Sequence, residues 1–145
     1  MSTNINDLEE KKLIFGTMQY IYWEVDIDSV TYTITAFNNM SLMFHLANNQ
    51  GIDAVLFPKL TDADYSTVKK LFNIVIELVE QSAKTYQGDK NLFTAYFLLQ
   101  PYVGDMDEDL EGIQKKGVEV NTIGDTKTGG TSFRKYSIEI DTKKL

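Results

Sequence analysis

The stretch VTYTITAF, residues 30–37, alternates threonine with larger or apolar side chains. Successive side chains of a β-strand point to opposite faces of the sheet, so this alternation predicts a strand with one apolar face. Residues 13–25 before it are rich in aromatic and β-branched side chains, and residues 26–29 between the two segments have turn chemistry. A longer helix over residues 13–25 is the alternative, because some apolar residues there also have helical spacing. We favour a β-hairpin.

Farther along the chain, apolar side chains recur every three or four residues between Tyr65 and Tyr86. This period predicts one long helix near residues 62–86. Thr61 and Asp64 resemble a capping box at its start, although Glu or Gln is the usual second member. The middle of the helix is apolar on most sides, so it needs cover on two sides, and another subunit is one source of that cover.

A second, shorter helix is predicted near residues 39–49, with an asparagine as its N-cap. Its apolar stripe would consist of Met40, Met43, Phe44 and Ala47. His45 would then lie on the polar, exposed face of this helix. Residues 53–57 are predicted to form a short strand after it.

The remaining segments complete the expected fold. We predict short helices at residues 5–11 and 107–116, and a strand at 91–100, for which a helix is the less favoured alternative. A second hairpin is predicted from residues 118–123 and 132–141 around a long loop, 124–131. The whole chain, residues 1–145, is expected to be a single α+β domain. Its sheet is expected to be mixed and mainly antiparallel, with about five strands, two hairpins and the two longer helices packed on it.

Composition narrows the class of protein. The chain has 145 residues and no cysteine, which excludes disulfides, thiolate metal sites and a cysteine nucleophile. We expect no signal peptide, because the first twelve residues lack a basic and an apolar segment. No apolar run is long enough to span a membrane. We therefore expect a cytoplasmic protein, or a virion component if its role is structural.

The net charge of −7, with a sequence pI of about 4.6, bears on the partner. An acidic surface repels phosphate backbones, so neither nucleic acid nor an anionic membrane is an expected ligand. The same charge suits a basic protein partner, since complementary charges speed encounter. The alternative is that acidity only keeps the protein soluble.

Catalytic and metal-binding patterns are weak. His45 is the only histidine, and no G-x-S-x-G elbow or orienting acid accompanies it. The alternating acids of residues 105–111 resemble the start of an EF-hand loop, but Leu110 and Lys116 stand where that loop needs Gly and Glu. Residues 124–131 resemble a phosphate-binding loop, but Gly130 replaces its lysine. We predict no catalytic residue, cofactor or resident metal, and we leave a weak divalent-cation site at 105–111 open.

Two groups of residues are candidates for binding. Tyrosine and tryptophan are frequent in protein interfaces, and acids suit a basic partner. The predicted partner-binding residues are Tyr20, Tyr22, Trp23, Asp105, Asp107, Glu108, Asp109 and Glu111. The predicted assembly loop, which is locally basic and rich in glycine, contains Lys127, Gly129, Gly130 and Arg134.

These observations favour a non-catalytic, acidic protein-binding module, such as an immunity protein, an inhibitor or a chaperone, that occludes a basic surface of its partner. A structural subunit of a phage tail, neck or similar assembly, binding other copies of itself as an oligomer, is the first alternative. A small-ligand binder or enzyme that uses carboxylates is the second. Its acids would come from Asp26, Asp28, Asp105 or Asp107, and their spacing selects no pair.

Overall fold

The computed structural model describes residues 5–38, 42–48, 51–60, 63–85, 91–99, 117–128 and 130–144. Its strands are β1 (Lys11–Phe15), β2 (Met18–Ile27), β3 (Val30–Asn38), β4 (Leu42–Asn48), β5 (Leu92–Leu99), β6 (Val118–Thr128) and β7 (Thr131–Asp141). Its α-helices are α1 (Ile52–Leu56) and α2 (Tyr65–Lys84), and single 3-10 turns lie at Ile5–Asp7 and Thr142–Lys144.

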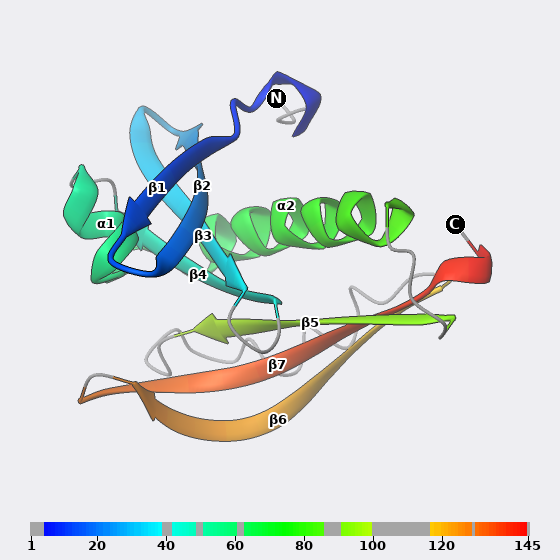
Figure 1. The fold of residues 1–145 in the computed structure, drawn as a ribbon. Helices are drawn as coiled ribbons and strands as arrows, with labels where there is room; N and C mark the ends of the chain where they lie inside the picture. The colour runs from blue at the N-terminus through cyan, green and yellow to red at the C-terminus, as the bar shows by residue number, and fades with distance from the viewer. Residues whose placement is uncertain are drawn as a thin grey trace.

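The described strands form one mixed sheet in the order β1-β2-β3-β4-β5-β7-β6. All neighbours are antiparallel except β4 and β5, which are parallel and joined through the two helices. The sheet bends around α2, with β1 to β4 on one side of the helix and β5 to β7 below it (Figure 1). The α+β class and the mixed sheet are therefore confirmed, and the long helix predicted near residues 62–86 is matched in part by α2, Tyr65–Lys84. The expected number of about five strands is too low, since the described residues form seven.

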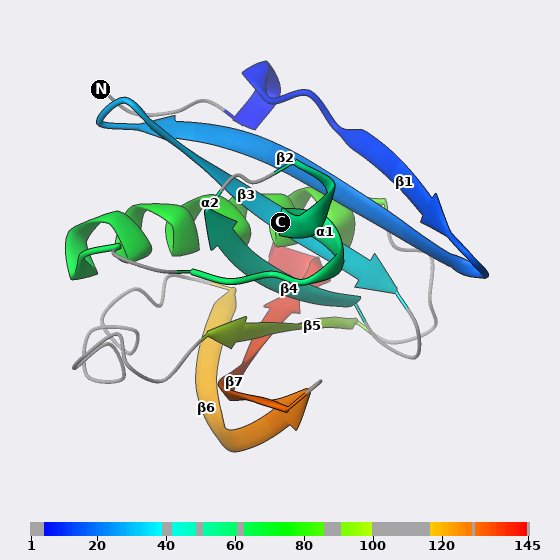
Figure 2. The same ribbon diagram turned by 90° about the vertical axis from the view of Figure 1, so that its left-hand side faces the viewer.

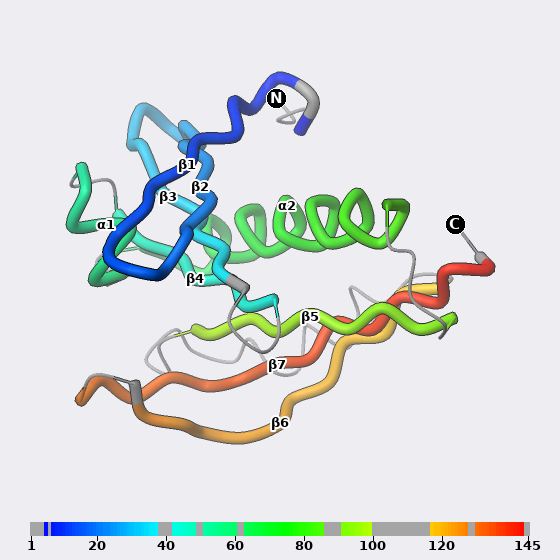
Figure 3. Tube along the Cα trace, in the orientation of Figure 1, coloured from blue at the N-terminus to red at the C-terminus, as the bar shows by residue number. Residues whose placement is uncertain are grey.

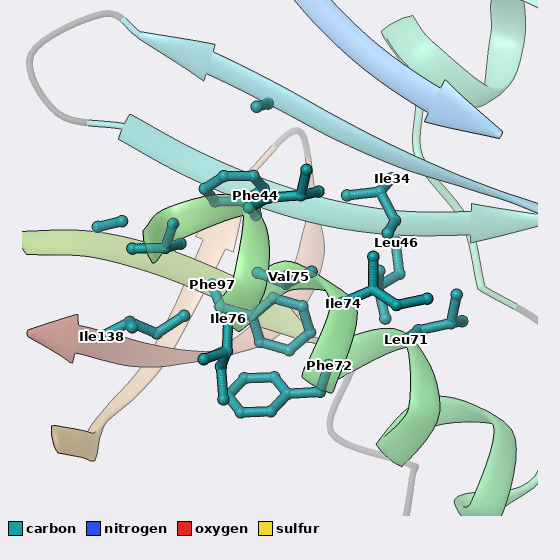
Figure 4. Packing of buried hydrophobic residues seen from close by; sticks show 14 of the residues in the cluster. Ile34, Phe44, Leu46, Leu71, Phe72, Ile74, Val75, Ile76, Phe97 and Ile138 are labelled. Atoms are coloured by element: carbon teal, nitrogen blue, oxygen red, sulfur yellow. The ribbon is translucent and has the colours of Figure 1, made fainter. Parts of the chain in front are cut away.

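The register divides the side chains between an inner face, which packs on α2, and an outer face. Residues directly opposite each other in neighbouring strands point to the same face. The inner face carries the core, in which Phe72 of α2 meets Phe97 of β5 edge to face, with ring centroids 4.9 Å apart. Figure 4 shows these rings among buried residues of α2 and the central strands. Trp23 of β2 stacks on Phe44 of β4 in the same core.

The first hairpin is confirmed, and it has one more strand than predicted. Asp28 and Ser29 form its two-residue turn, with φ of 51° and 67°. Two positive φ angles match the primed turn whose twist suits a hairpin. Gly16, with φ of 64°, makes a second turn inside residues 13–25 and separates β1 from β2. Residues 13–25 are thus strand, not helix, on both sides of that turn.

The predicted helix near residues 39–49 is wrong, because residues 42–48 form β4. This strand lies between β3 and β5, so both of its edges are paired, and side chains on both of its faces are buried. Phe44 and Leu46 face the core, whereas His45 and Ala47 are buried on the outer face. A strand that is buried on both faces has a continuous apolar run, which periodicity alone cannot distinguish from a helix.

The predicted strand at residues 53–57 is also wrong, because Ile52–Leu56 form the short helix α1. Both neighbours of β4 are already strands, so this segment has no free edge of β4 to join. Instead, Ala54 and Val55 are buried and α1 contacts β3 and β4. Figure 2 shows α1 on the side of β3 and β4 that faces away from α2.

The long helix is shorter than predicted, Tyr65–Lys84 in place of residues 62–86, and it has a different cap. Asp64, not Thr61, is the N-cap: its side chain accepts a hydrogen bond of 2.8 Å from the backbone N–H of Thr67. That bond holds the pKa of the Asp64 carboxyl below its ordinary value. The chain itself covers α2 on more than one side, since Ile74 and Ile76, which lie on roughly opposite sides of the helix, are both buried. The expected second cover therefore does not require another subunit.

The second hairpin is confirmed and is longer than predicted. β6 and β7 pair along residues expected in the 124–131 loop, and a bulge between Thr122 and Gly124 leaves Ile123 exposed. The last pair between β7 and β5 is Arg134 with Leu99, so the hairpin continues beyond the end of β5 (Figure 3). The expected helix at residues 107–116 lies outside the described residues.

Candidate protein-binding surface

A row of aromatic and apolar side chains crosses the outer face of the sheet. Register places each member directly opposite the next, from β1 to β5. The members of this cross-strand row are Leu13, Tyr20, Phe37, Met43 and Tyr96. Each is half-buried, so each presents part of its surface at the outer face. The rings of Tyr20 and Phe37 contact each other, with centroids 5.9 Å apart.

Two lysines of the chain lie over rings of this face. Lys135 Nζ is 4.4 Å from the centre of the Tyr96 ring, and Lys11 Nζ is 6.0 Å from that of Tyr22. An ammonium group over an aromatic face is attracted by the negative charge of the ring system. The outer face therefore already binds cations of its own chain at two places.

The row ends at the edge strand β1, where large apolar side chains are exposed. Among the described strands β1 pairs only with β2. Ile14 and Phe15, beside the β1–β2 turn, are 72% and 59% exposed. Phe15 lies opposite Met18 and so shares the outer face with Tyr20. Ile14, opposite Gln19, points to the other face, so Phe15 is the exposed apolar group that extends the row on the outer face; exposed apolar groups that gather on one face are typical of interaction sites.

Acids lie at the other end of β2. Glu24 and Asp26 point to the outer face, two and four residues beyond Tyr22, and Asp28 follows in the turn. Glu24 Oε1 is 3.0 Å from Lys11 Nζ, and this hydrogen bond raises the pKa of Lys11 above its ordinary value. Residues 5–38 contain six acids and two lysines and so carry −4 of the net charge of −7.

His45 is buried, not exposed as predicted, because it lies on a central strand and not on a helix. It is 5% exposed on the outer face, stacked on Phe37 and edge-on to Phe133, with both centroids 5.5 Å away. Its Nδ1 and the hydroxyls of Thr33 and Thr35 are buried and have no hydrogen-bond partner among the described residues. Burial lowers the pKa of His45 from 6.5 to about 4. The imidazole is therefore neutral near pH 7.

The structure separates the predicted aromatic residues. Tyr20 and Tyr22 lie on the outer face, half-buried, as members of β2. Trp23 is on the inner face and buried in the core, because neighbouring residues of a strand alternate between faces. It therefore packs the fold and offers little surface to a partner. The predicted acids Asp105, Asp107, Glu108, Asp109 and Glu111 lie outside the described residues.

The predicted assembly residues lie on the β6–β7 hairpin. Lys127 is exposed on β6, and Gly130, with φ of 82°, belongs to the turn before β7. Arg134 Nε donates to Asp125 Oδ1 at 3.0 Å, an ion pair across the two strands. Arg134 is thus engaged within the hairpin. Gly129 lies outside the described residues.

Residue-by-residue reasoning missed several members of this surface: Phe15, Phe37, Met43 and Tyr96. Met43 was assigned to a helix, and Phe37 and Tyr96 were not singled out. Tyr20 and Phe37 flank the same hairpin turn at equal distance, so pairing the two strands outward from that turn would have placed Phe37 opposite Tyr20. Met43 and Tyr96 depend on the β3–β4 and β4–β5 pairings, which local pattern does not supply.

Neither a metal cluster nor a membrane-spanning helix is found in the part of the chain that the structure describes. No three His, Asp or Glu side chains gather there into a set that could hold an ion. Neither described helix has both the length and the apolar character needed to cross a bilayer. No protein-family model, curated protein or solved structure matches the chain.

Proposed function

We propose that this chain is a non-catalytic, acidic protein-binding module that occludes a basic surface of its partner. The cross-strand row carries this proposal: five half-buried aromatic and apolar side chains lie side by side on the sheet face opposite α2. Tyrosine and phenylalanine supply large contact area with few rotatable bonds, so they are frequent at the centre of interfaces. The acids of β2 and its turn add the charge that suits a basic partner.

Affinity capture with the tagged full chain tests the proposal. We expect a cationic protein to be captured from the source cells and to be lost as salt rises from about 0.05 M to about 0.5 M, since exposed charges are then screened. Tyr20→Ser should reduce the capture about tenfold, because an interface aromatic contributes that much or more. Ile123→Ser, which removes an exposed apolar group from the opposite edge strand, is the matched control and should capture normally.

Circular dichroism confirms first that both variants are folded. Equal capture by the wild type, Tyr20→Ser and Ile123→Ser would refute the outer face as the binding surface. Capture of an acidic protein, or of one retained at high salt, would refute the occlusion of a basic surface.

A structural subunit of a larger assembly is the second candidate. The observation that favours it is the β6–β7 hairpin, because within the described residues Thr131 to Phe133 lie beyond the last pair of β7 with β5 and have their partners on β6. An extended hairpin can add to the sheet of a neighbouring subunit. Light scattering on the purified chain tests this candidate: it expects oligomers that disappear when residues 125–134 are replaced by a short turn, and a strict monomer contradicts self-assembly.

A further inference from the structure

The β1–β2 hairpin has a gradient of chemistry along its outer face. We call this surface the β1–β2 strip. It consists of Lys11, Leu13 and Phe15 of β1 and of Met18, Tyr20, Tyr22, Glu24 and Asp26 of β2. The end near the β1–β2 turn is apolar, with Phe15 opposite Met18 and Leu13 opposite Tyr20. The end near the β2–β3 turn is acidic, with Glu24, Asp26 and the turn residue Asp28.

The middle of the strip already binds a cation. Lys11 Nζ lies 3.0 Å from Glu24 Oε1 and 6.0 Å from the centre of the Tyr22 ring. A ring beside a carboxylate is a favourable environment for an ammonium or guanidinium group, because both partners attract positive charge. Farther along, Asp26 and Asp28 are exposed and pair with no cation among the described residues. The carboxylates of Asp26 and Asp28 can therefore pair with cationic groups of a partner.

We propose that the β1–β2 strip binds an extended segment of a partner protein whose apolar residues lie against Phe15 and Tyr20 and whose arginine or lysine residues lie against Asp26 and Asp28. This inference rests on the proposed protein-binding function and gives it an orientation. Met18 to Asp26 spans about 27 Å, at about 3.4 Å per residue, so a segment of about nine residues covers the strip. A segment bound the other way round would place cations against Phe15 and leave both acids unpaired.

A second copy of the chain fits the strip less well. Lys11 and Lys12 lie on β1, an edge strand of the described sheet, where their charges disfavour edge-to-edge pairing of two copies. Lysines on an edge strand are a common defence against that pairing. A partner segment with arginine or lysine can pair with Asp26 and Asp28, whereas a second copy of this chain carries the same net negative charge.

The test uses synthetic peptides and the full chain, followed by NMR chemical shifts. The first peptide, of about ten residues, has leucine and phenylalanine at alternate positions of one half and arginine at alternate positions of the other. A second replaces its arginines by glutamate, and a third replaces its leucines and phenylalanine by serine. A spin label at the arginine end of the first peptide reports the orientation.

We expect the first peptide to change the amide chemical shifts of residues 13–28. Its spin label should broaden the amide signals of Asp26 and Asp28 more than that of Phe15. The other two peptides should bind at least about tenfold more weakly. The double variant Asp26→Asn, Asp28→Asn should bind roughly fivefold more weakly. Asparagine tolerates the positive φ of Asp28, so this variant keeps the turn. Asp53→Asn, an exposed acid on α1, is the matched control and should bind normally.

Other results overturn the inference. The first is equal affinity for all three peptides, and the second is chemical-shift changes centred on α2 or on the β6–β7 hairpin. The third is broadening of the Phe15 signal in place of that of Asp26, and the fourth is self-association through β1, detected by sedimentation. If the first peptide does not bind while Tyr20-dependent capture of a cationic protein succeeds, the strip orientation is wrong and the protein-binding function stands. If the peptide binds as expected but no cationic protein is captured, the proposed function is refuted and the orientation of binding along the strip stands.

Discussion

Acid should destabilise this protein through His45. His45 is 5% exposed and its ring lies between those of Phe37 and Phe133; within the part of the chain that the structure describes, its buried Nδ1 has no hydrogen-bond partner. On the outer face it is opposite Thr35 on one side and Leu98 on the other. Lys135, the next residue along that row, is itself cationic. No described carboxylate faces the ring, so an imidazolium formed there would be buried without a counter-charge.

The size of the effect follows from the pKa of His45, which burial lowers from 6.5 to about 4. The folded state therefore takes up its proton at lower pH than the unfolded state, and stability falls as pH drops. The full contribution is present above about pH 6.5 and is lost between that value and about pH 4. Across this window the free energy of unfolding should fall by about 3 kcal/mol, with about 2 kcal/mol of that lost by pH 5.

Urea unfolding at several pH values measures this loss. Carboxylates also titrate in the window, so the comparison is with His45→Phe, which keeps an aromatic ring and removes the titration. His45→Gln is a second, smaller variant that guards against overpacking by the larger ring. The difference in unfolding free energy between each variant and the wild type should change by about 3 kcal/mol from about pH 7.5 to about pH 4. A difference that is constant over that range would refute the burial of a neutral His45.

Other substitutions test the fold. Asp64→Ala should lower the Tm by about 3 °C because it removes the acceptor for the Thr67 N–H, whereas Asp64→Asn should retain most of the cap. Ser29→Gly should raise the unfolding free energy by about 1 kcal/mol, because glycine adopts the positive φ of that turn without strain; denaturant melts measure the change. Leu71→Ala should cost about 3 kcal/mol in the same assay, and the control Leu92→Ala, at an exposed position, well under 1 kcal/mol.

Local pattern predicted the elements whose two sides differ. The alternation of residues 30–37 separates apolar from threonine side chains, and the helical period from Tyr65 onward separates apolar from polar ones; the two segments fold as a strand and a helix. Thr33 and Thr35 are nevertheless buried too. The same reasoning failed for β4, because Phe44 and His45 are both buried, on opposite faces. The parallel pairing of β4 with β5 is a tertiary contact, and no local signal in either segment specifies it.

The candidate surface was predictable only in part. Tyr20 and Tyr22 were found from their residue type, but assigning a face to each residue requires the strand register. Trp23 shows the consequence: it is adjacent to Tyr22 in sequence and lies on the other face of the sheet, in the core. Tyr96 joins the cross-strand row only because β5 returns beside β4 after α2. A row built from five strands is a property of the fold, which single segments do not reveal.

Hydrogen–deuterium exchange on the chain, alone and with its captured cationic partner, tests the proposed binding surface most directly. We expect the partner to slow amide exchange in residues 11–27, which form β1 and β2. Amide exchange in the solvent-facing residues of α2 should be unchanged. Slower exchange confined to α2 or to the β6–β7 hairpin, with β1 and β2 unaffected, would show that the protein binds its partner elsewhere.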